Sequence, residues 1–127
     1  MRNPQKYFPR ILLVEMTDLE EDLELLIREA KKDFESGRIT ERVYRENRTL
    51  YKNEIMGVRD FCNLLVETNY ADFNTLDDMI TYYIDTFKAM ARKKGLANAV
   101  ILCVERKIRK VKEYVTHTHI RKNRRLS

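Results

Sequence analysis

The residues closest to a metal-ligand arrangement lie near the C-terminus of the chain. Glu113 and His117 are four positions apart, so on a continuous helix they share a face, and His119 follows closely. The neighbourhood is rich in Lys and Arg, and the Glu-x-x-His spacing of di-iron helical bundles is absent. We therefore interpret Glu113 and His117 as a surface Glu–His pair, and we expect no metal site and no cofactor.

Other residues that carry chemistry do not combine into a site. Ser36 and Ser127 are the only serines, and neither is near a histidine in sequence. The three glycines are isolated, so a glycine-rich phosphate loop is absent. Glu20 and Glu24 share a helix face but lie among further acidic residues, which favours a solvated acidic surface over an acid–base pair. We expect no catalytic residues and no enzyme.

The charge distribution is the most informative functional feature. Residues 1–87 hold 12 Lys or Arg and 18 Asp or Glu, a net −6, whereas residues 88–127 hold 13 and 2, a net +11. The acidic stretch from Glu15 to Glu29 can attract the basic segment within one bundle or between two subunits.

A row of cations is expected on one side of the last helix, provided that it continues through His119. This row can contact the phosphate backbone of a nucleic acid. It can also be a solvated face that keeps the protein soluble, and this second interpretation has at least equal weight. The candidate anion- or nucleic-acid-binding residues are Arg106, Lys110, His117, Arg121, Lys122, Arg124 and Arg125.

The elements that position these residues start with a helical hairpin. Thr17 and Glu20 form a capping box, which predicts a helix from about Asp18. Gly37 can close that helix in the left-handed conformation, so a turn is expected at residues 36–39. The apolar residues at steps of three and four predict a buried stripe of Leu19, Leu23, Leu26, Ile27, Ala30 and Phe34.

The second helix of the hairpin is expected from a cap at Thr40, with Ile39 and Tyr44 as a hydrophobic staple, to about Glu67. Gly57 lies inside it and indicates a close helix contact or a slight bend, with a functional hinge less favoured. The second helix outreaches the first, so its far half needs another partner. Its apolar seam is Tyr44, Tyr51, Ile55, Val58, Cys62 and Leu65.

Two further helices follow. Thr75 with Asp78 marks the start of the third, Gly95 closes it, and the fourth begins almost at once. The sequence predicts an all-α fold: an antiparallel helical hairpin plus two helices, most simply a four-helix bundle with an extended N-terminal arm. The main alternative is an extended arrangement of two hairpins in one chain, which dimerises to complete its core. The residues chosen to mark the core, one from each stripe, are Leu26, Val58, Phe87 and Val104.

Domain boundaries follow from composition. Residues 1–16, with Asn-Pro and Phe-Pro pairs, are expected to be an arm, residues 17–117 a single helical domain, and residues 118–127 a basic tail. The arm contains an apolar run that is a candidate interaction surface, although packing on the chain's own core is favoured. The run consists of Ile11, Leu12, Leu13 and Val14.

The composition, with 43% hydrophobic residues, suits one globular domain, and three Gly and two Pro permit long helices. No apolar run approaches the roughly 20 residues that span a bilayer, and an export signal is absent, so a cytoplasmic location without membrane contact is expected. Cys62 and Cys103 are at or beside apolar positions and are interpreted as small hydrophobes, with a disulfide less favoured.

One segment of about 25 residues, 26–50, contains Phe34, Gly37, Ile39, Thr40, Glu41 and Tyr44. This pattern resembles the short helical hairpin of SHOCT-type domains. Such hairpins are associated with oligomerisation or with positioning attached domains, so the resemblance implies an interaction role. It does not extend to the rest of the chain.

The leading functional hypothesis is a small helical protein–protein interaction or adaptor protein that self-associates or binds a protein partner, because amphipathic helices are abundant and no catalytic pattern is present. The alternative is a nucleic-acid-associated protein that binds the phosphate backbone through its basic C-terminal helix and tail.

Overall fold

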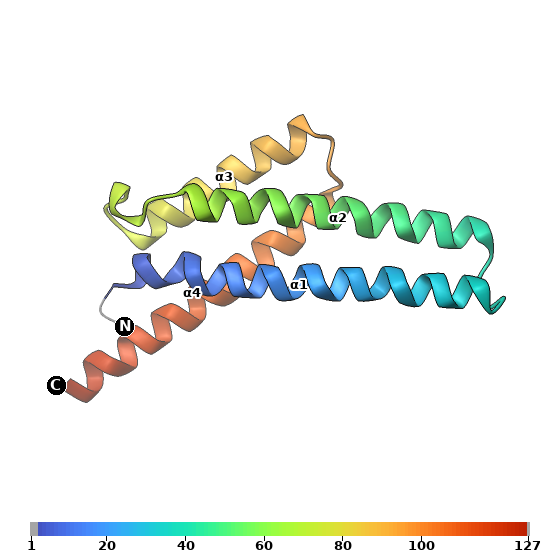
Figure 1. Ribbon diagram of the computed structural model, residues 1–127. Helices are drawn as coiled ribbons and strands as arrows, with labels where there is room; N and C mark the ends of the chain where they lie inside the picture. Colours follow the sequence, from blue (N-terminus) through green and yellow to red (C-terminus); the bar gives the residue numbers. More distant parts are fainter. Residues whose placement is uncertain (1–2, 127) are drawn as a thin grey trace.

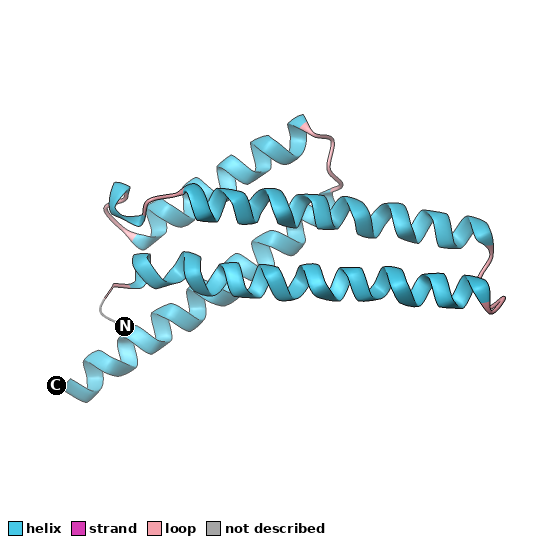
Figure 2. Cartoon of the chain, viewed as in Figure 1, coloured by secondary structure: helices cyan, strands magenta, loops and turns pink. Residues whose placement is uncertain are grey.

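The computed structural model describes the backbone of residues 3–126 and the side chains of residues 3–117. The chain forms four α-helices, α1 (Pro4–Glu35), α2 (Glu41–Glu67), α3 (Leu76–Lys93) and α4 (Asn98–Leu126), and a short 3-10 helix, η1 (Tyr70–Asp72). The described residues contain no strand (Figure 2). The all-α class, with a hairpin and two further helices, is confirmed.

The helices α1 and α2 form a long antiparallel hairpin, and α4 crosses it obliquely (Figure 1). The end of the hairpin that contains the turn between α1 and α2 extends beyond α3 and α4 (Figure 1). Between residues 24 and 54 only Ala30 is buried. We call residues 24–54 the distal half of the hairpin and the remainder of α1 and α2 the proximal half.

The turn at the distal end has the predicted geometry. Gly37 has φ 79°, a left-handed conformation that costs little only for glycine. The Arg38 N–H donates to the Asp33 carbonyl at 2.8 Å and closes α1. The Thr40 hydroxyl accepts from the Val43 N–H at 3.2 Å, so Thr40 caps α2 as expected.

The structure differs from the sequence prediction at the N-terminus. The first helix begins at Pro4, with the Asn3 side chain accepting from the Gln5 N–H at 3.1 Å, so the expected arm is helical from Pro4 onward. Thr17 is inside the helix, where its hydroxyl donates to the Leu13 carbonyl at 2.9 Å and caps nothing.

Tertiary packing explains why α1 continues through Pro9, which removes one backbone donor. On either side of this proline, Phe8 and Leu12 are fully buried. The Gln5 side-chain amide donates to the Phe73 carbonyl at 2.7 Å and ties the first turn to the segment after η1. These contacts involve residues far along the chain, which local capping signals do not contain.

The core is built in the proximal half, where α3 and α4 pack on the hairpin. Val58, Phe87 and Val104 are buried as predicted, but the prediction for Leu26 is wrong, because this side chain is 39% exposed. Leu26 belongs to the apolar stripe of α1, but it lies in the distal half of the hairpin, where its side chain remains exposed. The largest fully buried side chains are Tyr83, Phe8, Phe61, Phe87, Leu12, Met16, Met79 and Ile108.

Gly57 marks the place where α4 first meets the hairpin. A Cβ atom at this position would lie 2.5 Å from Val100 Cγ1 and 3.2 Å from Leu96 Cδ1. The close-contact interpretation of Gly57 is therefore confirmed. The predicted cap of α3 is also present, since the Thr75 hydroxyl accepts from the Asp78 N–H at 3.0 Å.

Candidate functional site

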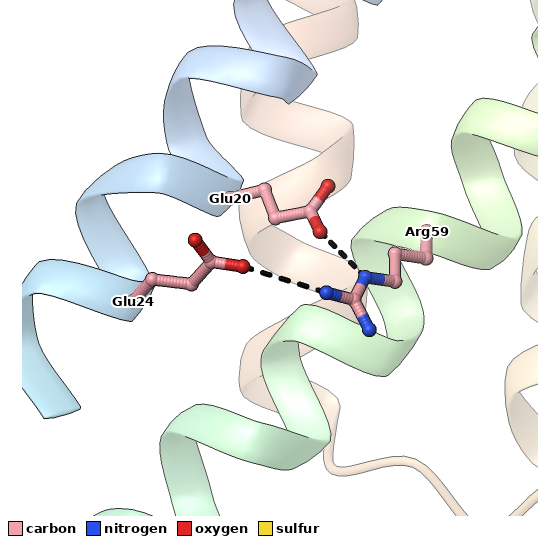
Figure 3. Close-up of polar contacts among 3 residues, drawn as sticks. All are labelled: Glu20, Glu24 and Arg59. Carbon is pink, nitrogen blue, oxygen red and sulfur yellow. Dashed lines mark hydrogen bonds and ion pairs between the residues drawn. The ribbon is translucent and has the colours of Figure 1, made fainter.

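Glu20 and Glu24 of α1 do not form an isolated acidic pair. Both carboxylates accept from the guanidinium of Arg59 on α2, and the Arg59 Nη2 to Glu24 Oε1 distance is 3.4 Å (Figure 3). The hydrogen bond to Glu20 and the charge of Glu20 raise the pKa of Arg59. The cluster joins the two helices of the hairpin at the surface, which is a structural role.

Glu113 and His117 lie on the exposed side of α4, with Glu113 Oε1 4.0 Å from His117 Nε2. Both side chains are mostly accessible, as expected for a surface pair. The His119 side chain lies outside the described residues. Within the part of the chain whose side chains are described, no group of three or more His, Cys, Asp or Glu is arranged to hold a metal ion.

Cys62 and Cys103 are both free thiols and both partly buried. Burial raises the pKa of each thiol, with a smaller contribution from nearby acidic side chains. A raised thiol pKa lowers the fraction of the reactive thiolate at neutral pH. The two cysteines therefore act as packing residues, in agreement with their interpretation as small hydrophobes.

The predicted cationic row on α4 is present as far as side chains are described. Arg106, Lys110 and His117 are exposed. Lys110 also faces α1, where its Nζ lies 3.8 Å from Glu15 Oε1, and Lys107 Nζ is 3.2 Å from Glu15 Oε2. The other four candidate residues lie outside the described side chains: Arg121, Lys122, Arg124 and Arg125.

The basic fourth helix thus binds acidic residues of the same chain. Besides the pairs with Glu15, Lys112 Nζ lies 3.0 Å from Asp77 Oδ1 of α3. One pair has the opposite sense, since Glu105 of α4 pairs with Lys88 of α3 at 3.0 Å. The expected attraction between the acidic and basic regions therefore operates within the bundle. The pairs are partly accessible to solvent, which screens them, so each is expected to add little to stability.

The apolar run near the N-terminus mostly faces the protein's own core. Leu12 is fully buried, Ile11 and Leu13 are partly buried against the core, and Val14 is 61% exposed. The favoured alternative, packing on the chain itself, describes three of these four residues. Only Val14 remains accessible to a partner.

The surface that sequence reasoning missed is on the distal half of the hairpin. Leu26, Val43 and Leu50 are 39%, 40% and 42% exposed. Val43 and Leu50 belong to a row of α2 that continues at helical steps through Gly57, which contacts α4, and Phe61, which contacts α3. The face that the other helices cover in the proximal half is therefore uncovered in the distal half.

The sequence did contain a signal for this surface. Val43 and Leu50 are seven residues apart and lie outside the seam that faces α1. Two apolar residues beside a complete seam indicate a second apolar face. The sequence prediction does not include this face, because the seam alone accounts for the pairing of α1 with α2.

Glu54 lies in the same row of α2, at the border between the two halves of the hairpin. Its carboxyl is partly buried, and burial raises its pKa. The charge of Glu54 also raises the pKa of Cys103 on α4, so Glu54 lies near the first turns of that helix. Among the residues with described side chains, Glu54 has no ion-pair partner.

The hairpin also has a hollow beside the Arg59 cluster. It is an open groove of about 650 Å³ lined by both charged and apolar side chains of α1 and α2, among them Glu24, Ile27, Lys52, Met56 and Arg59. Its openness to solvent and mixed lining do not resemble the enclosed, mainly apolar sites that bind small molecules.

No helix among the described residues is both long and apolar enough to cross a membrane. Comparisons of the chain with protein-family models, with curated proteins and with solved structures found no match.

Proposed function

We propose that this chain is a small helical interaction protein that binds a protein partner through the distal half of its α1–α2 hairpin. The observation that carries the proposal is a hairpin face that α3 and α4 cover in the proximal half only (Figure 1). In the distal half this face exposes Leu26, Val43 and Leu50. Projecting amphipathic hairpins of this kind offer a ready surface to another helix.

Two further features support the proposal. The segment that resembles a SHOCT-type hairpin, residues 26–50, coincides with the distal half, and such hairpins are associated with oligomerisation or with positioning attached domains. In addition, the residues that sequence analysis weighed for chemistry have other roles: Glu20 and Glu24 pair with Arg59, Glu113 pairs with His117, and the two cysteines are partly buried. Both a second copy of the chain and a different protein are candidates for the partner.

Site-specific photo-crosslinking in the native cell tests the proposal. A photoreactive amino acid replaces Leu50 in the full-length chain, and the matched control carries it at Leu102, which is 55% exposed on α4. We expect a discrete adduct from position 50 that position 102 does not give. If no adduct forms from position 50, or if positions 50 and 102 give identical adducts, the proposal is contradicted.

The mass of the adduct and sedimentation identify the kind of partner. An adduct of twice the 15.3 kDa chain, with a mass that rises with concentration and falls back in Leu26→Ser, indicates self-association. A chain that sediments as a monomer and gives an adduct of another mass indicates a different protein.

The second candidate function is binding of nucleic acid through α4. The observation that favours it is the net +11 of residues 88–127, with Arg106, Lys110 and His117 exposed on the described part of the helix. Contacts to phosphates release counterions, so affinity for DNA or RNA should fall steeply with salt and show little sequence preference.

Truncation of the chain after Thr116 tests this candidate, because it removes four Lys or Arg and keeps the buried residues of α4 whose side chains are described, which end at Val115. We expect weaker binding and a smaller salt dependence. The matched control neutralises four exposed cations elsewhere, in the variant Lys31→Gln, Lys32→Gln, Arg45→Gln and Arg48→Gln. Equal losses in the two variants would show that only net charge matters.

A further inference from the structure

A repeat of apolar and acidic residues runs along α1. Leu12 and Glu15, Leu19 and Asp22, and Leu26 and Glu29 follow one another at intervals of seven residues. Steps of three and four place all six on the same side of the helix. The side of α1 that α4 crosses therefore carries three similar units in succession.

The first unit shows what this pattern binds. Leu12 is fully buried, and Glu15 pairs with Lys107 and Lys110 of α4 at 3.2 and 3.8 Å. On the same helix, Val104, Ile108 and Val111 form the buried stripe. The unit thus accepts a helix that has an apolar stripe with lysines beside it.

The third unit is not covered. Leu26 is 39% exposed and Glu29 is exposed. From α2, Val43 and Leu50 add apolar area and Glu54 adds a partly buried carboxylate. Asp22, Glu29 and Glu54 have no ion-pair partner among the residues with described side chains, in contrast to Glu15.

We propose that the distal face of the hairpin binds a basic amphipathic helix of a different protein, in the way that the proximal face binds α4. This inference depends on the proposed function and names the chemistry of the partner. In this complex, the apolar stripe of the partner helix covers Leu26, Val43 and Leu50. The Lys or Arg side chains that flank the stripe of the partner pair with Glu29 and Glu54. Helix-in-groove recognition of this kind uses apolar anchors at helical spacing.

Charge also argues against a second copy as the occupant. Packing two distal faces against each other would bring the acidic side chains of both copies together, and like charges across an interface are unfavourable. The described basic residues of α4 that match this pattern, Lys107 and Lys110, already pair with Glu15 of their own chain. A separate basic helix meets neither obstacle.

Two synthetic helical peptides of about 20 residues, long enough for about five turns, are the probes. They share one leucine stripe and differ only in the flanking residues, which are Lys in one peptide and Glu in the other. Binding to the full-length protein is measured by fluorescence anisotropy at low and high salt. Because the protein carries a net +5, unspecific attraction would favour the Glu peptide.

We expect the Lys peptide to bind about tenfold more tightly than the Glu peptide at low salt, and this ratio to shrink at high salt. Leu50→Ser and Glu29→Lys should each weaken the Lys peptide about fivefold or more. The matched controls Leu102→Ser on α4 and Asp85→Lys on α3, both at exposed positions, should leave its affinity unchanged.

Each other result overturns the inference in an identifiable way. If the Glu peptide binds as tightly and is also weakened by Leu50→Ser, the distal face binds helices but not basic ones, and the proposed function stands. If the control variants lower affinity as much as the distal variants, the binding site is elsewhere. If neither peptide binds, the inference fails, and crosslinking from position 50 then decides the proposed function separately.

Discussion

The two halves of the α1–α2 hairpin consist of the same two helices but are stabilised differently. The proximal half is covered by α3 and α4 and contributes Phe8, Leu12, Val58 and Phe61 to the core. The distal half buries only Ala30. At its end the chain turns at Gly37, and the rings of Phe34 and Tyr44 stack with their centroids 5.1 Å apart.

The difference shows that helix formation and burial are separate properties of this sequence. Capping and helical periodicity extend through both halves, so both are helical. Only the proximal half gains the free energy of burying side chains on two sides. The distal half keeps an amphipathic surface without a partner in the chain, which is the basis of the proposed interaction role.

The largest effect expected from this comparison is that of Phe61→Ala in the proximal half. Phe61 is fully buried and packs edge-to-face on Phe87 at 5.3 Å, so its truncation should lower the free energy of unfolding by about 3–5 kcal/mol. Leu26→Ala in the distal half is the matched comparison, and it should cost less than about 1 kcal/mol. Urea denaturation measures both, and equal losses would contradict the division into halves.

The next effect concerns Tyr83, a fully buried residue of α3 whose hydroxyl lacks a hydrogen-bond partner among the described residues. Burial raises the pKa of Tyr83 to about 12. The Thr68 side chain lowers it only in part, because the Thr68 hydroxyl donates to the Leu64 carbonyl and does not form a well-aligned hydrogen bond with Tyr83. Removing an unpaired buried hydroxyl relieves its desolvation cost, so Tyr83→Phe should be at least as stable as the natural chain at neutral pH.

The same residue predicts a pH dependence. An unfolded tyrosine loses its proton near pH 10, whereas Tyr83 in the fold keeps its proton to about pH 12. Between these values the folded state binds more protons, so the free energy of unfolding should fall as pH rises, by at most about 2–3 kcal/mol. Thermal unfolding of the natural chain and of Tyr83→Phe between about pH 10 and 12 tests whether stability falls for this reason. The same decline in both proteins would contradict the role of Tyr83.

A smaller effect is expected at the border of the two halves, from Gly57→Ala. The added methyl group would lie 2.5 Å from Cγ1 of Val100, a β-branched side chain that adapts poorly. We expect a loss of about 1–2 kcal/mol, because displacement of α4 outweighs the gain of about 1 kcal/mol in helix propensity. Adding Val100→Ala should recover part of the stability lost at Gly57. If Gly57→Ala alone is more stable than the natural chain, α4 does not pack closely against α2 at this position.

The helix ends could be predicted from the sequence because their signals are local. Thr40, Thr75, Gly37 and Gly95 act through the backbone within a few residues, and each has its expected role. The start of α1 was not predicted although Asn3 before Pro4 is itself a local start signal, because Pro9, five residues later, argued against a helix that continues through it. Burial of Phe8 against Tyr83, with ring centroids 6.2 Å apart, depends on a residue 75 positions away.

The candidate site could be predicted only in part, for a related reason. Periodicity identified Leu26 as one of an apolar stripe, but it cannot tell which turns of a helix have a neighbour. The exposure of Leu26 is decided by where α4 begins to cover the hairpin, at Gly57. The attraction between acidic and basic regions was foreseeable from charge counts, whereas the choice of Glu15 as the partner of Lys107 depends on the crossing of two helices.

The smallest effect is expected for Arg59, which joins α1 and α2 near the border through Glu20 and Glu24. Arg59 is largely exposed, so solvent and salt screen the pairs and side-chain ordering opposes them. Arg59→Gln should therefore lower the thermal midpoint less than Phe61→Ala or Gly57→Ala, and the difference from the natural chain should vanish at high salt. A large, salt-independent loss would mean that this cluster, and not the burial of the proximal half, holds the two helices together. The division drawn between the halves would then rest on polar contacts at the border instead of on the cover that α3 and α4 provide.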